Sequence, residues 1–171
     1  MFTIGRDREK RHAGKYIRDP KNFSIVHNVI DAVHDCLEGS EDDDSVRQVF
    51  RDAFFEGGSG AWEQAGSWLR KLCSEYPRFS DIWTELAKHP KVDVRFHAAA
   101  FVVDMPDGVF PEMLQYFSHD RSKKIRLKIS GDLWVSPRHD ARPILEEWLT
   151  YEPDQEVSSE VRRAIEAQQT D

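Results

Sequence analysis

The side chains of this chain that could bind a metal ion are two histidines and an aspartate in one short stretch. His27, Asp31 and His34 are spaced so that a helix would place all three on one face. Two imidazoles and a carboxylate can hold Zn²⁺. The signal is nevertheless weak, because no matching ligand cluster occurs elsewhere in the sequence. The sequence therefore predicts no metal and no other cofactor.

Catalytic motifs give an equally weak signal. The sequence contains no serine nucleophile elbow, no HExxH and no CxxC pair. The glycine-rich turn at 57–60 lacks the spacing and the lysine of a phosphate-binding loop. His119-Asp120 and His139-Asp140 precede helix starts, where aspartate is a common cap. We therefore predict that the chain is not an enzyme.

The elements that must position these residues are predicted to be helices. Apolar residues recur at helical spacing in one segment after another, and no run alternates in the manner of a strand. Nine or ten helices are expected, so the fold class is all-α. Residues 6–17 form either a first helix ended by Asp19-Pro20 or a loose basic arm, and Ser24 is expected to cap the next helix. The further helices are predicted at 24–38, 45–56, 61–75, 80–88, 91–104, 110–119, 122–134, 140–151 and 156–168.

Composition and charge restrict the class of protein. The chain has 171 residues, 39% hydrophobic and 32% charged, which suits one domain spanning 1–171. No secretory signal is recognisable at the N-terminus, so a cytoplasmic location with buried thiols at Cys36 and Cys73 is expected. The net charge is −7, with +4 in residues 1–21 and −11 in the remainder. An acidic chain favours a basic protein partner over nucleic acid, although acidity also serves solubility alone.

An aliphatic-arginine pair recurs along the chain and suggests a structural repeat. Its last three copies are 31 and 36 residues apart, a period typical of stacked helical pairs. The four copies are Val46-Arg47, Val94-Arg95, Ile125-Arg126 and Val161-Arg162. In these residues the chain resembles the HEAT-repeat family, whose units are antiparallel helix pairs with an aliphatic-arginine pair opening the second helix. The resemblance covers residues 41–169 and implies an α-solenoid; residues 1–40 do not match the repeat.

The resemblance also implies roles for individual residues. Arg47, Arg95, Arg126 and Arg162 would be structural, each pairing with an acid in a turn and stacking between units. The second helices would line a concave binding face. On that face Phe96 and Leu127 occupy the same register and would form an exposed apolar pair, flanked by Asp93, His97 and Lys128. The N-terminal arm or a second copy of the chain, in a homodimer, could instead cover this pair.

The acidic run Glu41-Asp42-Asp43-Asp44 is the other candidate partner-binding surface. Its carboxylates would also stabilise the N-terminus of the following helix, which is a sufficient structural reason for them. By analogy with small, acidic, HEAT-like immunity proteins, we expect a protein-binding module that neutralises a cognate bacterial toxin by occlusion. The alternatives are a HEAT-like lyase or chaperone for a cofactor-bearing protein and a HEAT-like DNA-repair protein. The basic cluster Arg121, Lys123, Lys124, Arg126 and Lys128 is the one local argument for nucleic-acid binding.

Overall fold

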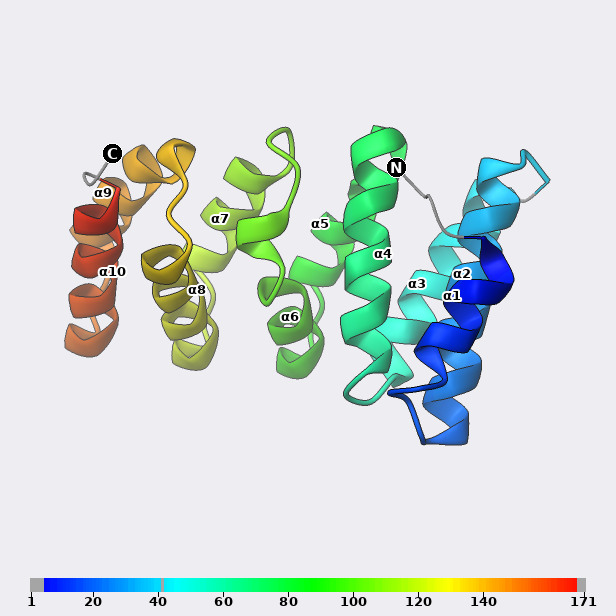
Figure 1. The fold of residues 1–171 in the computed structure, drawn as a ribbon. Coiled ribbons are helices and arrows are strands. Elements are labelled where there is room, and N and C mark those ends of the chain that lie inside the picture. Colours follow the sequence, from blue (N-terminus) through cyan, green and yellow to red (C-terminus); the bar gives the residue numbers. More distant parts are fainter. Residues whose placement is uncertain (1–4, 41, 169–171) are drawn as a thin grey trace. The chain divides into compact units, whose positions relative to one another are not determined.

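The computed structural model describes residues 5–40 and 42–168, and within them all regular structure is helical (Figure 1). These residues form ten α-helices and three short 3₁₀ helices, without a strand. The prediction of an all-α fold is confirmed. The helices are α1 Arg6–Ala13, α2 Pro20–Leu37, α3 Asp43–Glu56, α4 Ala61–Glu75, η1 Pro77–Phe79, α5 Asp81–Ala87, α6 Val92–Ala99, η2 Val102–Asp104, α7 Phe110–Ser118, α8 Lys123–Val135, η3 His139–Ala141, α9 Arg142–Tyr151 and α10 Gln155–Ala167.

The chain divides into two units, Met1–Leu86 and Ala87–Asp171, which are called the N-terminal and C-terminal units below. In the N-terminal unit, α2 packs against α1, α3 and α4. Large apolar side chains of this unit, such as Phe50, Leu72 and Trp83, are completely buried. The rings of Phe54 and Trp83 meet edge to face, with centroids 5.9 Å apart. Burial of these aromatic side chains supplies the main driving force for folding of this unit.

In the C-terminal unit, α6, α8 and α10 form one set of helices, and α7 and α9 form another. Helix α8 packs against both α6 and α10, and α7 packs against α8 and α9. The apolar stripe of α8 is completely buried and consists of Ile125, Ile129 and Leu133. Phe117 of α7 and Trp148 of α9 are completely buried as well. The spacing of four residues between the α8 side chains keeps them on one helical face. The other faces of α6, α8 and α10 are therefore left for polar contacts.

The start of α2 corrects the sequence analysis. Asp19-Pro20 does not end a helix but begins one. The Asp19 carboxylate accepts a hydrogen bond from the backbone N–H of Asn22 at 2.8 Å and so caps α2. Proline at the first position of a helix has a suitable φ and lacks an N–H that would have no partner. The prediction that Ser24 caps this helix is wrong, since Ser24 lies one turn inside it. Helix α1 is correspondingly short and ends at Ala13.

The interval predicted as one helix over 91–104 is divided in the structure. Helix α6 ends at Ala99, and the chain continues through Phe101 into the 3₁₀ helix η2. Phe101 has φ −108° and ψ 0°, outside the α-helical region, so the helix cannot continue through it. Apolar spacing alone does not distinguish the two, because 3₁₀ and α-helices both bury residues three positions apart.

Cys36 and Cys73 are both buried free thiols. Burial raises the pKa of the Cys73 thiol to about 12, against weaker opposing hydrogen bonds, so this group is neutral and unreactive near neutral pH. The sequence prediction of buried thiols is confirmed for these two residues. None of the helices that the structure describes is long and apolar enough to cross a membrane.

The first prediction tests the start of α2. Asp19→Ala should lower the free energy of unfolding by about 1 kcal/mol, because the Asn22 amide loses its acceptor. Asp19→Asn should cost much less, since asparagine is also a good N-cap. Urea denaturation followed by circular dichroism measures both. The matched control is Ser24→Ala: a larger loss for this variant than for Asp19→Ala would show that the cap lies at Ser24 instead.

Candidate functional site

The C-terminal unit contains a buried ion pair at the start of α6. The guanidinium of Arg95 donates from Nε and Nη2 to the two carboxylate oxygens of Asp120, at 2.7 and 3.1 Å. Its Nη1 donates to the backbone carbonyls of His89 and Pro90, at 2.9 and 3.0 Å. The side chains of Arg95 and Asp120 are only 7% and 5% exposed. Arg95 therefore joins the turn before its own helix to the turn before α8.

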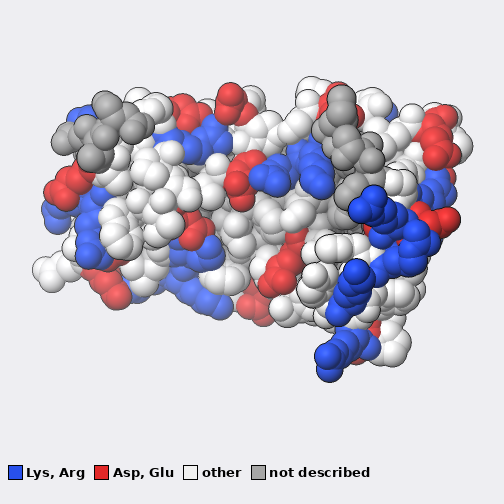
Figure 2. Space-filling model, in the orientation of Figure 1, with Lys and Arg blue, Asp and Glu red and all other residues white. Residues whose placement is uncertain are grey.

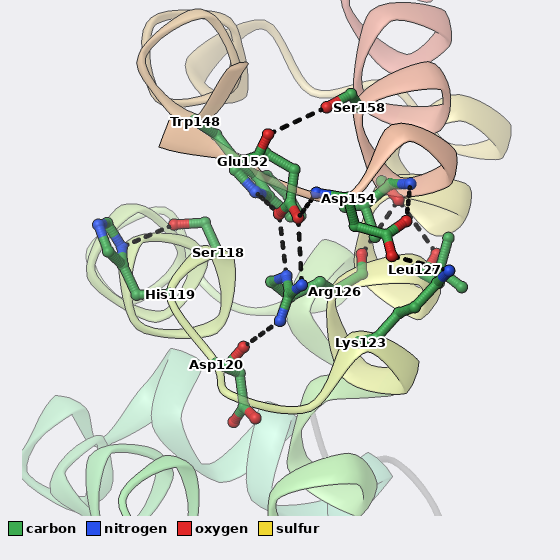
Figure 3. Close-up of polar contacts among 12 residues, drawn as sticks. Ser118, His119, Asp120, Lys123, Arg126, Leu127, Trp148, Glu152, Asp154 and Ser158 are labelled. Carbon is green, nitrogen blue, oxygen red and sulfur yellow. Dashed lines mark hydrogen bonds and ion pairs between the residues drawn. The ribbon is translucent and has the colours of Figure 1, made fainter. Parts of the chain in front are cut away.

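Arg126 makes the same connection one helix pair further along the chain (Figure 3). Its Nε and Nη2 donate to the Glu152 carboxylate at 2.9 and 3.1 Å, and its Nη1 donates to the carbonyl of Asp120 at 2.7 Å. Asp120 therefore accepts from Arg95 through its side chain and from Arg126 through its backbone. We call the four residues Arg95, Asp120, Arg126 and Glu152 the arginine ladder.

Glu152 is held ionised by its neighbours. Burial works against the charged form, but hydrogen bonds from Arg126, from Trp148 Nε1 at 2.8 Å and from the Asp154 amide outweigh it, so the pKa of Glu152 is lowered. Its side chain is only 1% exposed. All these contacts fix the carboxylate in one orientation, which makes it a structural anchor and not a group available for chemistry.

Beyond the ladder, the next contact of this kind is made by Ser158 and not by Arg162. Arg95 and Arg126 each donate to the carbonyl of the residue six positions before them, and the Ser158 hydroxyl donates to the Glu152 carbonyl with the same separation, at 3.4 Å. Arg162 lies one helical turn beyond this register and is exposed, and no ion pair joins it to another described residue. The structure therefore does not bring Arg162 together with the other repeat arginines.

Arg47 in the N-terminal unit makes related but more exposed contacts. Its Nε donates to Asp81 at 3.2 Å and its Nη2 to the Arg78 carbonyl at 2.9 Å, both in the segment that leads into α5. The guanidinium also lies over the Phe79 ring, 5.2 Å from its centroid. Arg47, Arg95 and Arg126 thus share one feature: each reaches an acid that comes later in the chain, in or next to a turn.

The acidic run divides into structural and available carboxylates. Asp42 is the N-cap of α3, accepting from the amides of Asp44 and Ser45, and hydrogen bonds with Ser45 lower its pKa. Asp43 accepts from Arg78 Nε at 2.7 Å, which lowers its pKa as well. The Asp44 side chain is 99% exposed. Glu41 lies outside the described residues. Asp44 is therefore the member of this run most available to a partner.

The predicted apolar pair on α6 and α8 is only partly exposed. Phe96, His97, Leu127 and Lys128 are all half-buried, and Asp93 is exposed. The Lys124 ammonium lies over the Phe96 ring, 4.0 Å from its centroid. Lys128 forms an ion pair with Asp132 on its own helix. The surface is therefore mixed in polarity, since an ammonium covers its largest aromatic group.

A more exposed apolar group on the same unit was not selected from the sequence. Trp134 and Val135 at the end of α8 are 47% and 71% exposed, and Arg163 lies over the Trp134 indole at 4.9 Å. The spacing of Ile125, Ile129 and Leu133 already places residue 134 outside the buried stripe. The exposure of Trp134 could therefore be predicted from the apolar spacing of α8.

The other candidate clusters are occupied by partners within the chain. Asp31 pairs with Lys10 at 2.6 Å, and Nε2 of His34 lies 3.1 Å from Glu9. The described residues contain no group of three side chains that could hold a metal ion. In the basic cluster of α8, Lys123 pairs with Asp154 and Glu156 at 2.9 and 2.8 Å. These contacts reduce the positive charge that this cluster could offer to phosphate groups.

Comparison of the chain with models of protein families, with curated proteins and with solved structures finds no match.

The second prediction tests the ladder. Arg95→Met should lower the free energy of unfolding by roughly 3–5 kcal/mol, because it leaves the Asp120 carboxylate buried without its partner. Arg162→Met should change it by no more than about 0.5 kcal/mol, since this side chain is exposed. Urea denaturation compares the two variants. Equal losses would contradict the assignment. The double variant Arg95→Met with Asp120→Leu should recover much of the loss, because no unpaired charge remains buried.

The third prediction concerns pH. The pKa of Glu152 is lowered in the folded chain, so its stabilising contribution is present above the ordinary carboxylate pKa and is lost as pH falls through the lowered value. Glu152→Gln removes this contribution. Its free energy of unfolding should therefore fall less than that of the wild type between about pH 6 and about pH 3. An equally steep fall in both proteins, measured by denaturation across that range, would show that Glu152 titrates normally.

Proposed function

We propose that this chain is a non-catalytic protein-binding module made of HEAT-like helix pairs stacked as an α-solenoid. The observation that supports it best is the pattern of arginine contacts at regular separation. Arg95 and Arg126 join successive turns, and their separation of 31 residues corresponds to one helix pair. Stacked pairs of this kind present extended faces that suit binding of another protein.

We further propose that the partner is a basic protein, and specifically a toxin that this chain neutralises as an immunity protein. Residues 22–86 contain thirteen acidic and five basic side chains, a net charge of −8, so this part of the N-terminal unit is strongly acidic. Opposite fields speed association and orient the partners. A basic nuclease toxin could be occluded by such a surface, because the acidic side chains would compete with its nucleic-acid substrate.

The binding surface is proposed to lie on the exposed side of α3. Asp44 and Asp52 are exposed there, whereas Asp81 and Glu85 on α5 are already paired with Arg47 and Arg51. Asp42 and Asp43 are less suitable contacts, because the N-cap and the pair with Arg78 already use their carboxylates. The α3 surface therefore offers charge that a partner can neutralise without disrupting the fold.

The immunity proposal is tested by co-expression. The chain should restore growth of cells that produce the secreted toxin encoded beside its gene, and the two purified proteins should form a complex that blocks the toxin's activity. Absence of both rescue and complex formation would contradict the proposal. A complex that leaves the toxin active would support protein binding but would contradict neutralisation.

The fourth prediction identifies the surface. The double variant Asp44→Lys with Asp52→Lys should lower the association rate constant with a basic partner about tenfold at low salt, and the difference should shrink as salt is added. The matched control is Glu112→Lys with Glu147→Lys, which reverses two exposed charges on α7 and α9. Surface plasmon resonance measures both. Equal slowing by the two double variants would show that net charge acts, and not the α3 surface.

A further inference from the structure

Helix α1 separates its basic side chains into two groups. Arg6 and Lys10 face α2, where they pair with Asp35 at 2.5 Å and with Asp31 at 2.6 Å. Arg8, Arg11 and His12 of α1 line a hollow together with Lys15, which lies in the turn after this helix. No ion pair joins these four to another described residue. Figure 2 shows Lys and Arg side chains gathered along α1, on a unit that is otherwise acidic.

A pocket of about 400 Å³ opens beside this basic face, within the N-terminal unit. Its walls come from α1, α2 and α4, and Ala13, Ile30 and Trp68 supply apolar surface. Arg8, His12 and Lys71 place cationic or ionisable groups around it, with the Lys71 ammonium 5.2 Å from the centroid of the Trp68 ring. Glu9 also lines the pocket, but its carboxylate is already engaged by His34.

We propose that this pocket binds a small anion with a planar apolar body, such as an aromatic carboxylate or phosphate. The volume lies within the range of small-molecule sites, which combine apolar walls with a few placed polar groups. The indole and Ile30 contact the apolar body. Arg8 and Lys71 hold the anionic group, and Arg8 can do so through two parallel hydrogen bonds. A second hollow of about 410 Å³, lined by Arg8, Arg11, His12 and Lys15, extends the basic side of the site.

An acidic peptide from a partner protein is the other ligand that such chemistry could accept. The pocket favours the small molecule because the three helices α1, α2 and α4 wall it. A peptide would instead need a continuous groove for its backbone. This site is separate from the acidic α3 surface and does not depend on the function proposed above.

The test uses isothermal titration calorimetry on the full chain with 2-naphthoate, 2-naphthyl phosphate and the neutral isostere 2-naphthamide. Either anion should bind at a single site, about tenfold or more tightly than the amide, because a charged hydrogen bond is lost in the neutral compound. Arg8→Gln and Lys71→Gln should each weaken anion binding about tenfold and should leave the weak amide binding unchanged. Arg18→Gln is the matched control, an exposed cation of the same basic segment that lies outside the pocket lining.

A blocking variant makes the location falsifiable. Ser67→Phe places a ring in the pocket mouth from α4 and should abolish binding of all three compounds, with unchanged circular dichroism and melting temperature. If a variant fails to fold, amide shifts of the wild-type protein on adding 2-naphthoate must cluster in α1 and α4. The proposal is overturned if neither anion binds, if binding survives Arg8→Gln and Ser67→Phe, or if an acetylated Asp-Trp-Glu peptide binds while the naphthyl anions do not.

Discussion

The buried guanidinium of Arg95 needs hydrogen-bond acceptors, and this need constrains the turns of the C-terminal unit. A buried guanidinium is destabilising unless carboxylate and carbonyl oxygens satisfy its N–H groups. Arg95 makes four such hydrogen bonds, to Asp120 and to the carbonyls of His89 and Pro90. These acceptors lie in two different turns, so both turns must keep fixed positions. Arg126 imposes the same condition on the next turn through Asp120 and Glu152. Helix packing and turn geometry are therefore coupled along the unit.

The sequence predicted the helices better than the contacts between them. The limits of α4 were predicted as observed, because its apolar spacing is regular and glycine and proline bound it. The start of α2 was wrong, since proline was treated as a helix terminator although Asp19 before it is a good cap. Arg95 and Arg126, two of the arginines in the repeated pair, form ion pairs with Asp120 and Glu152. Periodicity and turn chemistry are local, and a single sequence displays them directly.

The acids that pair with these arginines could not be predicted from local sequence patterns. The resemblance implied only that each repeat arginine pairs with an acid in a turn, whereas the structure pairs Arg95 with Asp120 and Arg126 with Glu152, each about 25 residues later. Such pairing depends on how helices stack, which local spacing does not encode. The role of Ser158 could not be predicted for the same reason. Only its hydrogen bond to the Glu152 carbonyl shows that it takes the position in its helix that Arg95 and Arg126 take in theirs. The contact of the Lys124 ammonium with the Phe96 ring likewise joins two different helices, α8 and α6.

The charges of the chain are arranged so that structural and available groups are distinct. Asp42, Asp43 and the ladder carboxylates are held by caps or arginines, while Asp44 and Asp52 remain exposed on α3. On α1 the division concerns cations, with Arg6 and Lys10 paired and Arg8 beside the pocket. A protein-binding function and a small-anion site would each use the available set. Neither would require the structural set to change its contacts.

Hydrogen–deuterium exchange of the wild type and Arg126→Met tests most directly whether the ladder holds successive helix pairs together. The amides of α8, α9 and α10 should lose protection together in the variant, because Arg126 joins the turn before α8 to the turn before α10. The amides of α2, α3 and α4 in the N-terminal unit should keep theirs. Unchanged protection of α8 to α10, or an equal loss throughout both units, would contradict the account.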